Sequence, residues 1–168
     1  MTHIKRDYYS PTYEINPLTM AVLPQHDKEG NTSSHVIEGN EDYFVAFSPS
    51  KVIDFACRFF GSSLKGRQEG TKAVSNITHK APISVAPSSG IYFLPTLSPV
   101  NPMCGWIAHS HIKEINRAPE GTEIVFKNGR NVIVEVSFGS MLNQVQRTAQ
   151  FRYWLENRIN YLDRPDFP

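Results

Sequence analysis

The spacing of apolar residues alternates between two periods along this 168-residue chain, and this alternation limits the folds that it can adopt. Strand-like segments come first, at 13–15, 18–23, 35–38 and 43–47. Helical spacing follows, and a period of two returns from Pro82, with strands predicted at 83–86, 91–94, 106–115, 123–126 and 132–136. A long helical pattern comes last. The order predicts an α+β fold with a largely antiparallel sheet of short strands.

Local signals place three helices, two central ones at about 48–60 and 64–75 and a C-terminal one at about 140–162. Ser48 and Pro49 suit the N-cap and the first helical position. Gly61 suits the end of the first helix, and a serine after it can cap the second. The pair has the outline of a helix-turn-helix, although Gly66 and Gly70 make the second helix a poor reader of the major groove.

Asn128-Gly129 is a strong hairpin signal between the last two predicted strands, because both turn positions need a positive φ. We see no repeat and no linker that would divide the chain. The predicted organisation is therefore a flexible N-terminal arm at 1–12, a single domain at 13–162 and a short tail at 163–168.

The composition, 40% hydrophobic and 20% charged, is normal for a soluble globular protein. No apolar run reaches the length of a membrane span, and no apolar stretch follows the N-terminal charges as in a secretory signal. Two cysteines without an export signal indicate reduced thiols and a cytoplasmic location.

The chain contains a basic segment at 57–82, although its net charge is only +1. It contains one acid, Glu69, and six groups that can carry positive charge: Arg58, Lys65, Arg67, Lys72, His79 and Lys80. Residues 1–47, in contrast, hold three basic and seven acidic side chains. Cations interleaved with Gly, Ser and Thr suit a surface that contacts phosphates. The alternative is a solvated basic helix face on an ordinary globular protein.

A metal site or a cysteine–histidine nucleophile is one interpretation of three residues close together in the sequence, Cys104, His109 and His111. In one continuous strand the two histidines would share one face, whereas Cys104 and Trp106 would share the other. The usual zinc-ligand spacings are also absent. We therefore expect a packed cysteine and hydrogen-bonded histidines, with no metal and no cofactor.

The C-terminal helix carries a predicted apolar stripe of Met141, Leu142, Val145, Ala149, Leu155, Ile159 and Leu162. An adjacent flank alternates cations with aromatic residues: Arg147, Phe151, Trp154 and Arg158. Arg152 and Glu156 interrupt the stripe, either because self-association buries this face or because the two residues form an intrachain ion pair.

Seven ordered blocks of sequence resemble one known family. They are CRFFGSS (57–63), GRQEGTK (66–72), HKAPI (79–83), FLPTLSP (93–99), CGWIAHSHI (104–112), FKNGR (126–130) and NQVQRTAQFR (143–152). Together they closely resemble the competence transcription factor family of bacilli, the ComK-like proteins. The similarity covers about 13–162.

The resemblance implies a cytosolic transcription activator of DNA-uptake genes that binds paired A/T-rich boxes of double-stranded DNA, chiefly through the minor groove, and bends them. It also implies a homo-oligomer (dimer or tetramer), nucleoid association when bound to DNA, and two protein partners, RNA polymerase and a Clp-protease adaptor. Longer members continue past the last helix with a charged tail that is associated with activation and proteolytic control. A shortened paralogue that binds DNA but activates poorly is therefore one expectation.

The expected DNA contacts are our own inference from the residues: Arg58, Lys65, Arg67, Lys72, His79 and Lys80, followed by Arg147 and Arg152. Arg67, between two glycines, is the best candidate for insertion into a narrow A/T minor groove, whose negative potential attracts arginine. The others would contact phosphates. The alternatives are a metal-dependent enzyme that uses Cys104 and the histidines, and an interaction module that keeps the fold without binding DNA.

Overall fold

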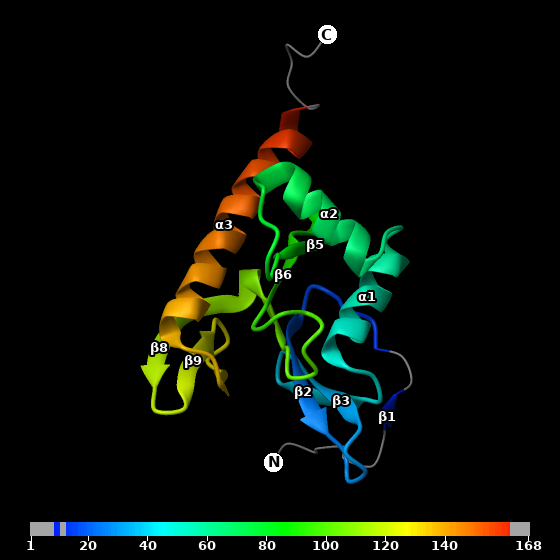
Figure 1. Ribbon diagram of the computed structural model, residues 1–168, viewed down its shortest axis with the longest axis vertical. Helices are drawn as coiled ribbons and strands as arrows, with labels where there is room; N and C mark the ends of the chain where they lie inside the picture. The colour runs from blue at the N-terminus through cyan, green and yellow to red at the C-terminus, as the bar shows by residue number, and fades with distance from the viewer. Residues whose placement is uncertain (1–8, 11–12, 162–168) are drawn as a thin grey trace.

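The computed structural model describes residues 9–10 and 13–161 and has an α+β fold, as predicted (Figure 1). A seven-stranded sheet has the order β1-β4-β3-β2-β7-β6-β5, and a three-stranded sheet has the order β10-β9-β8. All of the neighbouring strands are antiparallel except β1 and β4.

The larger sheet comprises β1 (Tyr9–Ser10), β2 (Thr19–His26), β3 (Thr32–Glu38), β4 (Glu41–Val45), β5 (Ile83–Ala86), β6 (Ile91–Pro95) and β7 (Trp106–Ala108). The smaller comprises β8 (Ile112–Ala118), β9 (Gly121–Phe126) and β10 (Asn131–Val134). The helices are α1 (Pro49–Phe59), α2 (Leu64–Ser75) and α3 (Phe138–Tyr161), and two short 3-10 helices are η1 (Pro87–Ser89) and η2 (His109–His111). Of the expected arm at 1–12, only β1 is described, and the expected tail at 163–168 lies outside the described residues.

The two central helices begin and end as their local signals predict. Ser48 is extended and Pro49 opens α1, while Gly61 adopts a φ of 84° after the helix. The Ser63 hydroxyl accepts a hydrogen bond from the Gly66 amide (2.9 Å) and so caps α2.

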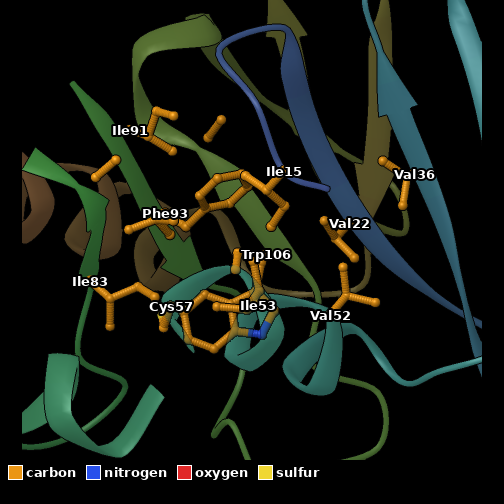
Figure 2. Close-up of a cluster of buried hydrophobic side chains, with 14 of the residues drawn as sticks. Ile15, Val22, Val36, Val52, Ile53, Cys57, Ile83, Ile91, Phe93 and Trp106 are labelled. Atoms are coloured by element: carbon orange, nitrogen blue, oxygen red, sulfur yellow. The ribbon is translucent and has the colours of Figure 1, made fainter. Parts of the chain in front are cut away.

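The larger sheet is buried on both faces. On one face α1 packs Val52, Ile53 and Cys57 against Phe93 and Trp106, as Figure 2 shows. The Trp106 indole nitrogen donates a hydrogen bond to the Ser50 hydroxyl (3.1 Å), so the largest buried side chain has its polar atom satisfied.

The opposite face packs against the smaller sheet and the first turns of α3. Side chains that alternate with the first set, such as Leu94 and Ile107, contact Ile124, Phe126 and Met141 in a second core. Because the strands alternate their side chains, the larger sheet forms a middle layer between α1 and the smaller sheet.

Two of the predicted strands are wrong. No strand forms at 13–15, where Ile15 is buried in the first core and Tyr13 donates a hydrogen bond to Glu38 (2.7 Å). The predicted strand at 106–115 is divided by η2, so that β7 belongs to the larger sheet and β8 to the smaller one. The expected alternation of Cys104 and Trp106 against the two histidines therefore does not apply beyond β7.

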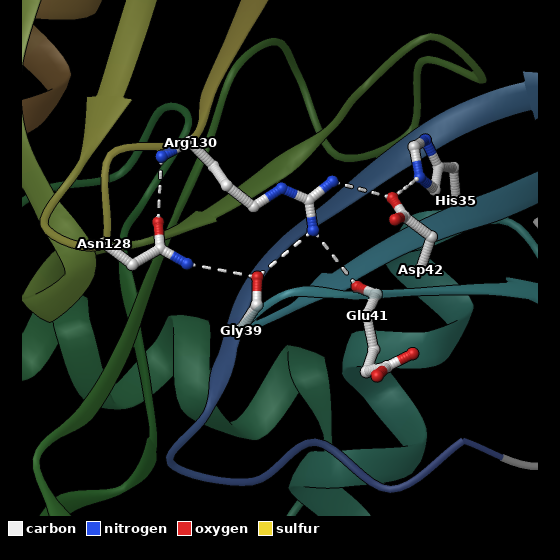
Figure 3. A network of polar contacts seen from close by, with 6 residues as sticks. All are labelled: His35, Gly39, Glu41, Asp42, Asn128 and Arg130. Atoms are coloured by element: carbon white, nitrogen blue, oxygen red, sulfur yellow. Dashed lines mark hydrogen bonds and ion pairs between the residues drawn. The ribbon is translucent and has the colours of Figure 1, made fainter. Parts of the chain in front are cut away.

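The hairpin at Asn128-Gly129 forms, but its turn differs from the prediction, because Gly129 has a positive φ (91°) and Asn128 does not. The hairpin attaches the smaller sheet to the β3–β4 turn (Figure 3). Arg130 donates hydrogen bonds to the carbonyl oxygens of Gly39 (3.1 Å) and Glu41 (3.3 Å) and to Asp42 Oδ1 (2.9 Å). Asp42 also contacts His35 Nε2 at 2.7 Å. Although burial raises the pKa of the Asp42 carboxyl, these hydrogen bonds outweigh it and lower the pKa below its usual value.

The predicted apolar stripe of α3 is right for Met141 and Val145, which pack in the second core, and wrong for the exposed Ala149, while Leu162 lies outside the described residues. The buried residues are Met141, Gln144, Thr148 and Phe151, while Leu142 and Ile159 are 37% exposed. Arg152 and every residue after it in α3 are at least partly exposed. Only the first half of this helix therefore lies in the core.

Candidate nucleic-acid interface

Helix α2 holds its basic side away from the core. Thr71 is fully buried, and its hydroxyl donates a hydrogen bond to the Pro82 carbonyl (2.6 Å), which fixes the rotation of the helix against β5. Lys65 and Lys72 lie seven residues apart, close to two turns, so they share one side, and both are exposed. Gly70 faces solvent, and a methyl group added there would contact no atom within 4 Å.

The segment after α2 is held against α3. Asn76 ends α2 in the left-handed conformation, with a φ of 64°. Arg147 Nη2 then donates a hydrogen bond to the His79 carbonyl (2.7 Å), and Gln144 Nε2 donates one to the Lys80 carbonyl (2.9 Å). These contacts fix the exposed His79 and the half-buried Lys80 beside the C-terminal end of α2.

Arg58 lies at the junction of α1 and α2. Its side chain is 64% exposed and forms an ion pair with Asp54 (2.8 Å), four residues earlier in α1. Asp54 also accepts a hydrogen bond from the Leu64 amide (2.8 Å), so that one carboxylate links the two helices. Burial raises the pKa of the Asp54 carboxyl, but the hydrogen bonds from Leu64 and Arg58 outweigh this effect, so the pKa lies below its usual value. The resulting carboxylate offsets part of the Arg58 charge.

Like Arg58, the other three predicted arginines take part in intrachain contacts. Arg67 is half-buried and donates hydrogen bonds to the carbonyls of Phe60 (3.3 Å) and Val85 (3.4 Å). Its Nε is buried without a hydrogen bond to any described residue. Arg147 holds the segment after α2, as described above.

Arg152 makes the intrachain ion pair that was one of the two expectations, with Glu156 at 2.8 Å. It also donates to the Ser110 hydroxyl (2.6 Å) and stacks over the Tyr92 ring, 4.8 Å from its centroid. Its contacts outside α3 are therefore with η2, which holds Ser110, and with β6, which holds Tyr92.

Lys65 and Lys72 lie on α2, His79 and Lys80 lie in the segment after its C-terminal end, and Arg58 lies near its other end. We call these five residues the α2 surface. Sequence reasoning missed Gln144, which positions this surface. Its helical spacing with Met141 and Phe151 was the available signal, but an amide at a core position is not expected from the pattern of apolar residues.

The cysteines and histidines do not assemble into a reactive site. Cys104 is buried and donates a hydrogen bond to the Leu97 carbonyl (3.3 Å), and burial raises its pKa. Burial also raises the pKa of Cys57, to about 12, so both thiols stay protonated at neutral pH. Among residues 13–161, no three His, Cys, Asp or Glu side chains lie close enough together to bind a metal ion.

Within the described part of the chain, no helix has both the length and the apolar character needed to cross a membrane.

The fold and the α2 surface define an α+β domain that displays cations on one helix. The chain belongs to the ComK protein family, whose family model matches residues 10–160. It is 42% identical over 158 residues to the competence transcription factor of Bacillus subtilis (strain 168), which covers 94% of this chain and 82% of that relative. No solved structure gives a significant match.

Proposed function

We propose that this protein is a transcription activator of competence genes that binds double-stranded DNA through the α2 surface. The observation that carries the proposal is the set of exposed cations on α2, in a chain whose relative is named a competence transcription factor. Lysines on one side of a helix suit a row of phosphates.

The finer part of the proposal is that the protein reads paired A/T-rich boxes in the minor groove and bends them. A narrow A/T minor groove attracts inserted cations, and its hydrogen-bonding pattern is too degenerate to require a rigid recognition helix. This fits α2, which carries two glycines. In this proposal Lys65, Lys72 and His79 contact phosphates on either side of the groove.

Arg67 has a second role in the proposal. In the free protein its hydrogen bonds to Phe60 and Val85 tie the α1–α2 turn to β5. Insertion into the groove would require that it exchange these two long hydrogen bonds for contacts with bases. Arg67→Lys separates the roles, because lysine keeps the charge but loses the planar group that bonds both carbonyls. If Arg67 enters the groove, this variant loses A/T preference; if it only holds the turn, stability falls and the preference remains.

The remaining features follow the family resemblance. We propose that the protein acts in the cytoplasm as a homo-oligomer, associates with the nucleoid when bound, and contacts RNA polymerase and a Clp-protease adaptor. We propose no cofactor and no enzymatic activity, because the relative is a transcription factor and both thiols are buried.

The test is fluorescence anisotropy with two duplexes of equal length, one with paired A/T-rich boxes and one rich in G/C, at moderate salt. We expect tighter binding to the A/T-rich duplex. Lys72→Ala should weaken binding to both duplexes alike, because a phosphate contact carries no sequence information. Lys28→Ala, which removes an equal charge from the exposed β2–β3 loop, is the matched control. Equal affinity of the wild type for both duplexes would refute the sequence preference, and no binding to either would refute the function.

A further inference from the structure

A second basic site lies on the other side of α3 from α2. A hollow of about 530 Å³ opens between η2, β8, the end of β9 and α3. Three cations line it, Lys113, Lys127 and Arg152, together with the His109 ring and the Ser110 hydroxyl. The cations come from three separate elements, so no single segment of the sequence reveals the cluster.

The Arg152 guanidinium and the backbone at Lys127 are held in place before any ligand arrives, while the Lys113 and Lys127 side chains are exposed. Arg152 is fixed by its stacking on Tyr92, its ion pair with Glu156 and its hydrogen bond to Ser110. The Lys127 amide donates a hydrogen bond to the carbonyl of His111 (2.9 Å), which anchors the end of β9 beside η2. A guanidinium that is already fixed binds an anion at a smaller entropic cost than a free side chain does.

The His109 ring supplies a further donor. Its Nδ1 lies 3.5 Å from Arg152 Nη1, and because a guanidinium can only donate, this contact favours the tautomer that carries its proton on Nε2. The proton of the neutral ring is then on Nε2, where it can be donated to an oxygen. Burial lowers the pKa of His109, and the charges of Arg152 and Lys127 lower it further. A bound anion would reverse the second effect.

Two carboxylates face the same region. Glu156 is paired with Arg152, and Glu114 lines the hollow from β8. Lys113 and Lys127 are exposed, and neither has a carboxylate within 4.0 Å in the part of the chain that the structure describes. Positive charge is therefore in excess. The aliphatic side chains of Ile115 and Val145 also line the hollow and offer an apolar surface beside the cations.

We propose that this hollow binds a phosphoryl group, with the ammonium groups of Lys113 and Lys127, the Arg152 guanidinium and His109 Nε2 as its donors. Two sources share this chemistry. One is a free phosphate ester, and a volume of this size accommodates a mononucleotide with its organic part against Ile115 and Val145. The other is a phosphate of a DNA backbone that passes η2. The site is separate from the α2 surface and does not depend on it.

The test follows the His109 ring by NMR as each of three probes is added: inorganic phosphate, adenosine monophosphate and a short DNA duplex. An anion near the imidazolium stabilises its charged form, so the pKa of His109 should rise on binding. The exposed His26, which lies outside the hollow, reports non-specific binding. A response to phosphate and the mononucleotide assigns a small ligand, and a response to the duplex alone assigns the DNA backbone.

Two variants separate this site from the α2 surface. Lys127→Ala should weaken the affinity measured from the His109 response about fivefold, in line with the loss of one exposed charge interaction, while Lys72→Ala should leave the response to phosphate and the mononucleotide unchanged. Lys72→Ala should in turn weaken duplex binding through α2. If none of the three probes moves His109, or if His26 responds equally, the proposed phosphate site is refuted whether or not the α2 surface binds DNA.

Discussion

Arg130 links the two sheets through polar contacts, and its loss should lower the stability of the fold. Its guanidinium crosses from the β9–β10 hairpin to the β3–β4 turn and donates to Gly39, Glu41 and Asp42 (Figure 3). The side chains of Arg130 and Asp42 are 28% and 8% exposed, so the ion pair is largely shielded from water. Arg130→Ala removes all three bonds at once.

The cost can be worked out from these contacts. A hydrogen bond to a charged group contributes about 1.5–3 kcal/mol, and Asp42 is not left alone because His35 still contacts it. The two carbonyls can recover water, so their loss adds little. We expect a decrease of about 2.5 kcal/mol in the free energy of unfolding, which lowers the Tm of a domain of this size by roughly 5–10 °C. Chemical denaturation and differential scanning calorimetry at pH 7 measure both quantities.

A control variant and the pH dependence of stability test the same contacts in two further ways. Lys127→Ala, at an exposed cation of the same hairpin, should change stability by less than about 0.5 kcal/mol. Because the folded-state pKa of Asp42 is lowered, its pairing stabilises the fold above the unfolded pKa of about 3.9 and is lost as the pH falls through the folded value. The difference in the free energy of unfolding between wild type and Arg130→Ala should therefore become smaller below about pH 4. An Arg130→Ala variant as stable at pH 7 as Lys127→Ala would show that the network does not hold the sheets together.

Three further predictions concern the cores. Cys57 should react with iodoacetamide at neutral pH far more slowly in the folded protein than in denaturant, because burial raises its pKa to about 12; equal rates would contradict this. Trp106→Phe should lower the free energy of unfolding by about 1–3 kcal/mol, since it leaves the Ser50 hydroxyl without its donor and a small cavity beside it, and a change near zero would argue against that packing. Gly121→Ala should cost at least about 3 kcal/mol, because its methyl group would lie 2.3 Å from the Val134 carbonyl oxygen at a φ of 148°; urea denaturation of a variant as stable as wild type would refute this.

The sequence predicted those parts of the fold that local chemistry determines. A serine and a proline begin α1, a left-handed glycine follows it, and Ser63 caps α2, so the helix ends were predictable within a residue or two. Asn128-Gly129 predicted the place of its hairpin, although not the conformation of Asn128, which lacks the expected positive φ. These signals act over a few residues and do not depend on the rest of the chain.

The sequence failed where a partner distant in the chain decides the outcome. The pattern at 106–115 is consistent with one strand, and only the packing of two sheets divides it at η2. In α3, Gln144 and Thr148 are buried because distant or backbone carbonyls satisfy them: Gln144 bonds those of Lys80 and Pro95, and Thr148 bonds the one of Gln144. A hydrophobic pattern cannot identify such positions.

The candidate site was predicted in part. Its basic segment was evident from the sequence, but the distinction between exposed cations and structural arginines was not. Arg67 and Lys65 are two residues apart, yet one lies against backbone carbonyls and the other is exposed, because α2 rotates Thr71 and its neighbours toward β5. That rotation depends on tertiary contacts.

The salt dependence of DNA binding tests the role of the α2 surface most directly. Each cation that neutralises a phosphate contributes about 0.9 to the slope of log affinity against log salt concentration. Lys65→Ala/Lys72→Ala should therefore bind more weakly and show a slope about 2 units shallower than wild type, while Lys28→Ala keeps the wild-type slope. If the double variant matches the wild type in both affinity and slope, DNA does not contact this surface and the account is wrong.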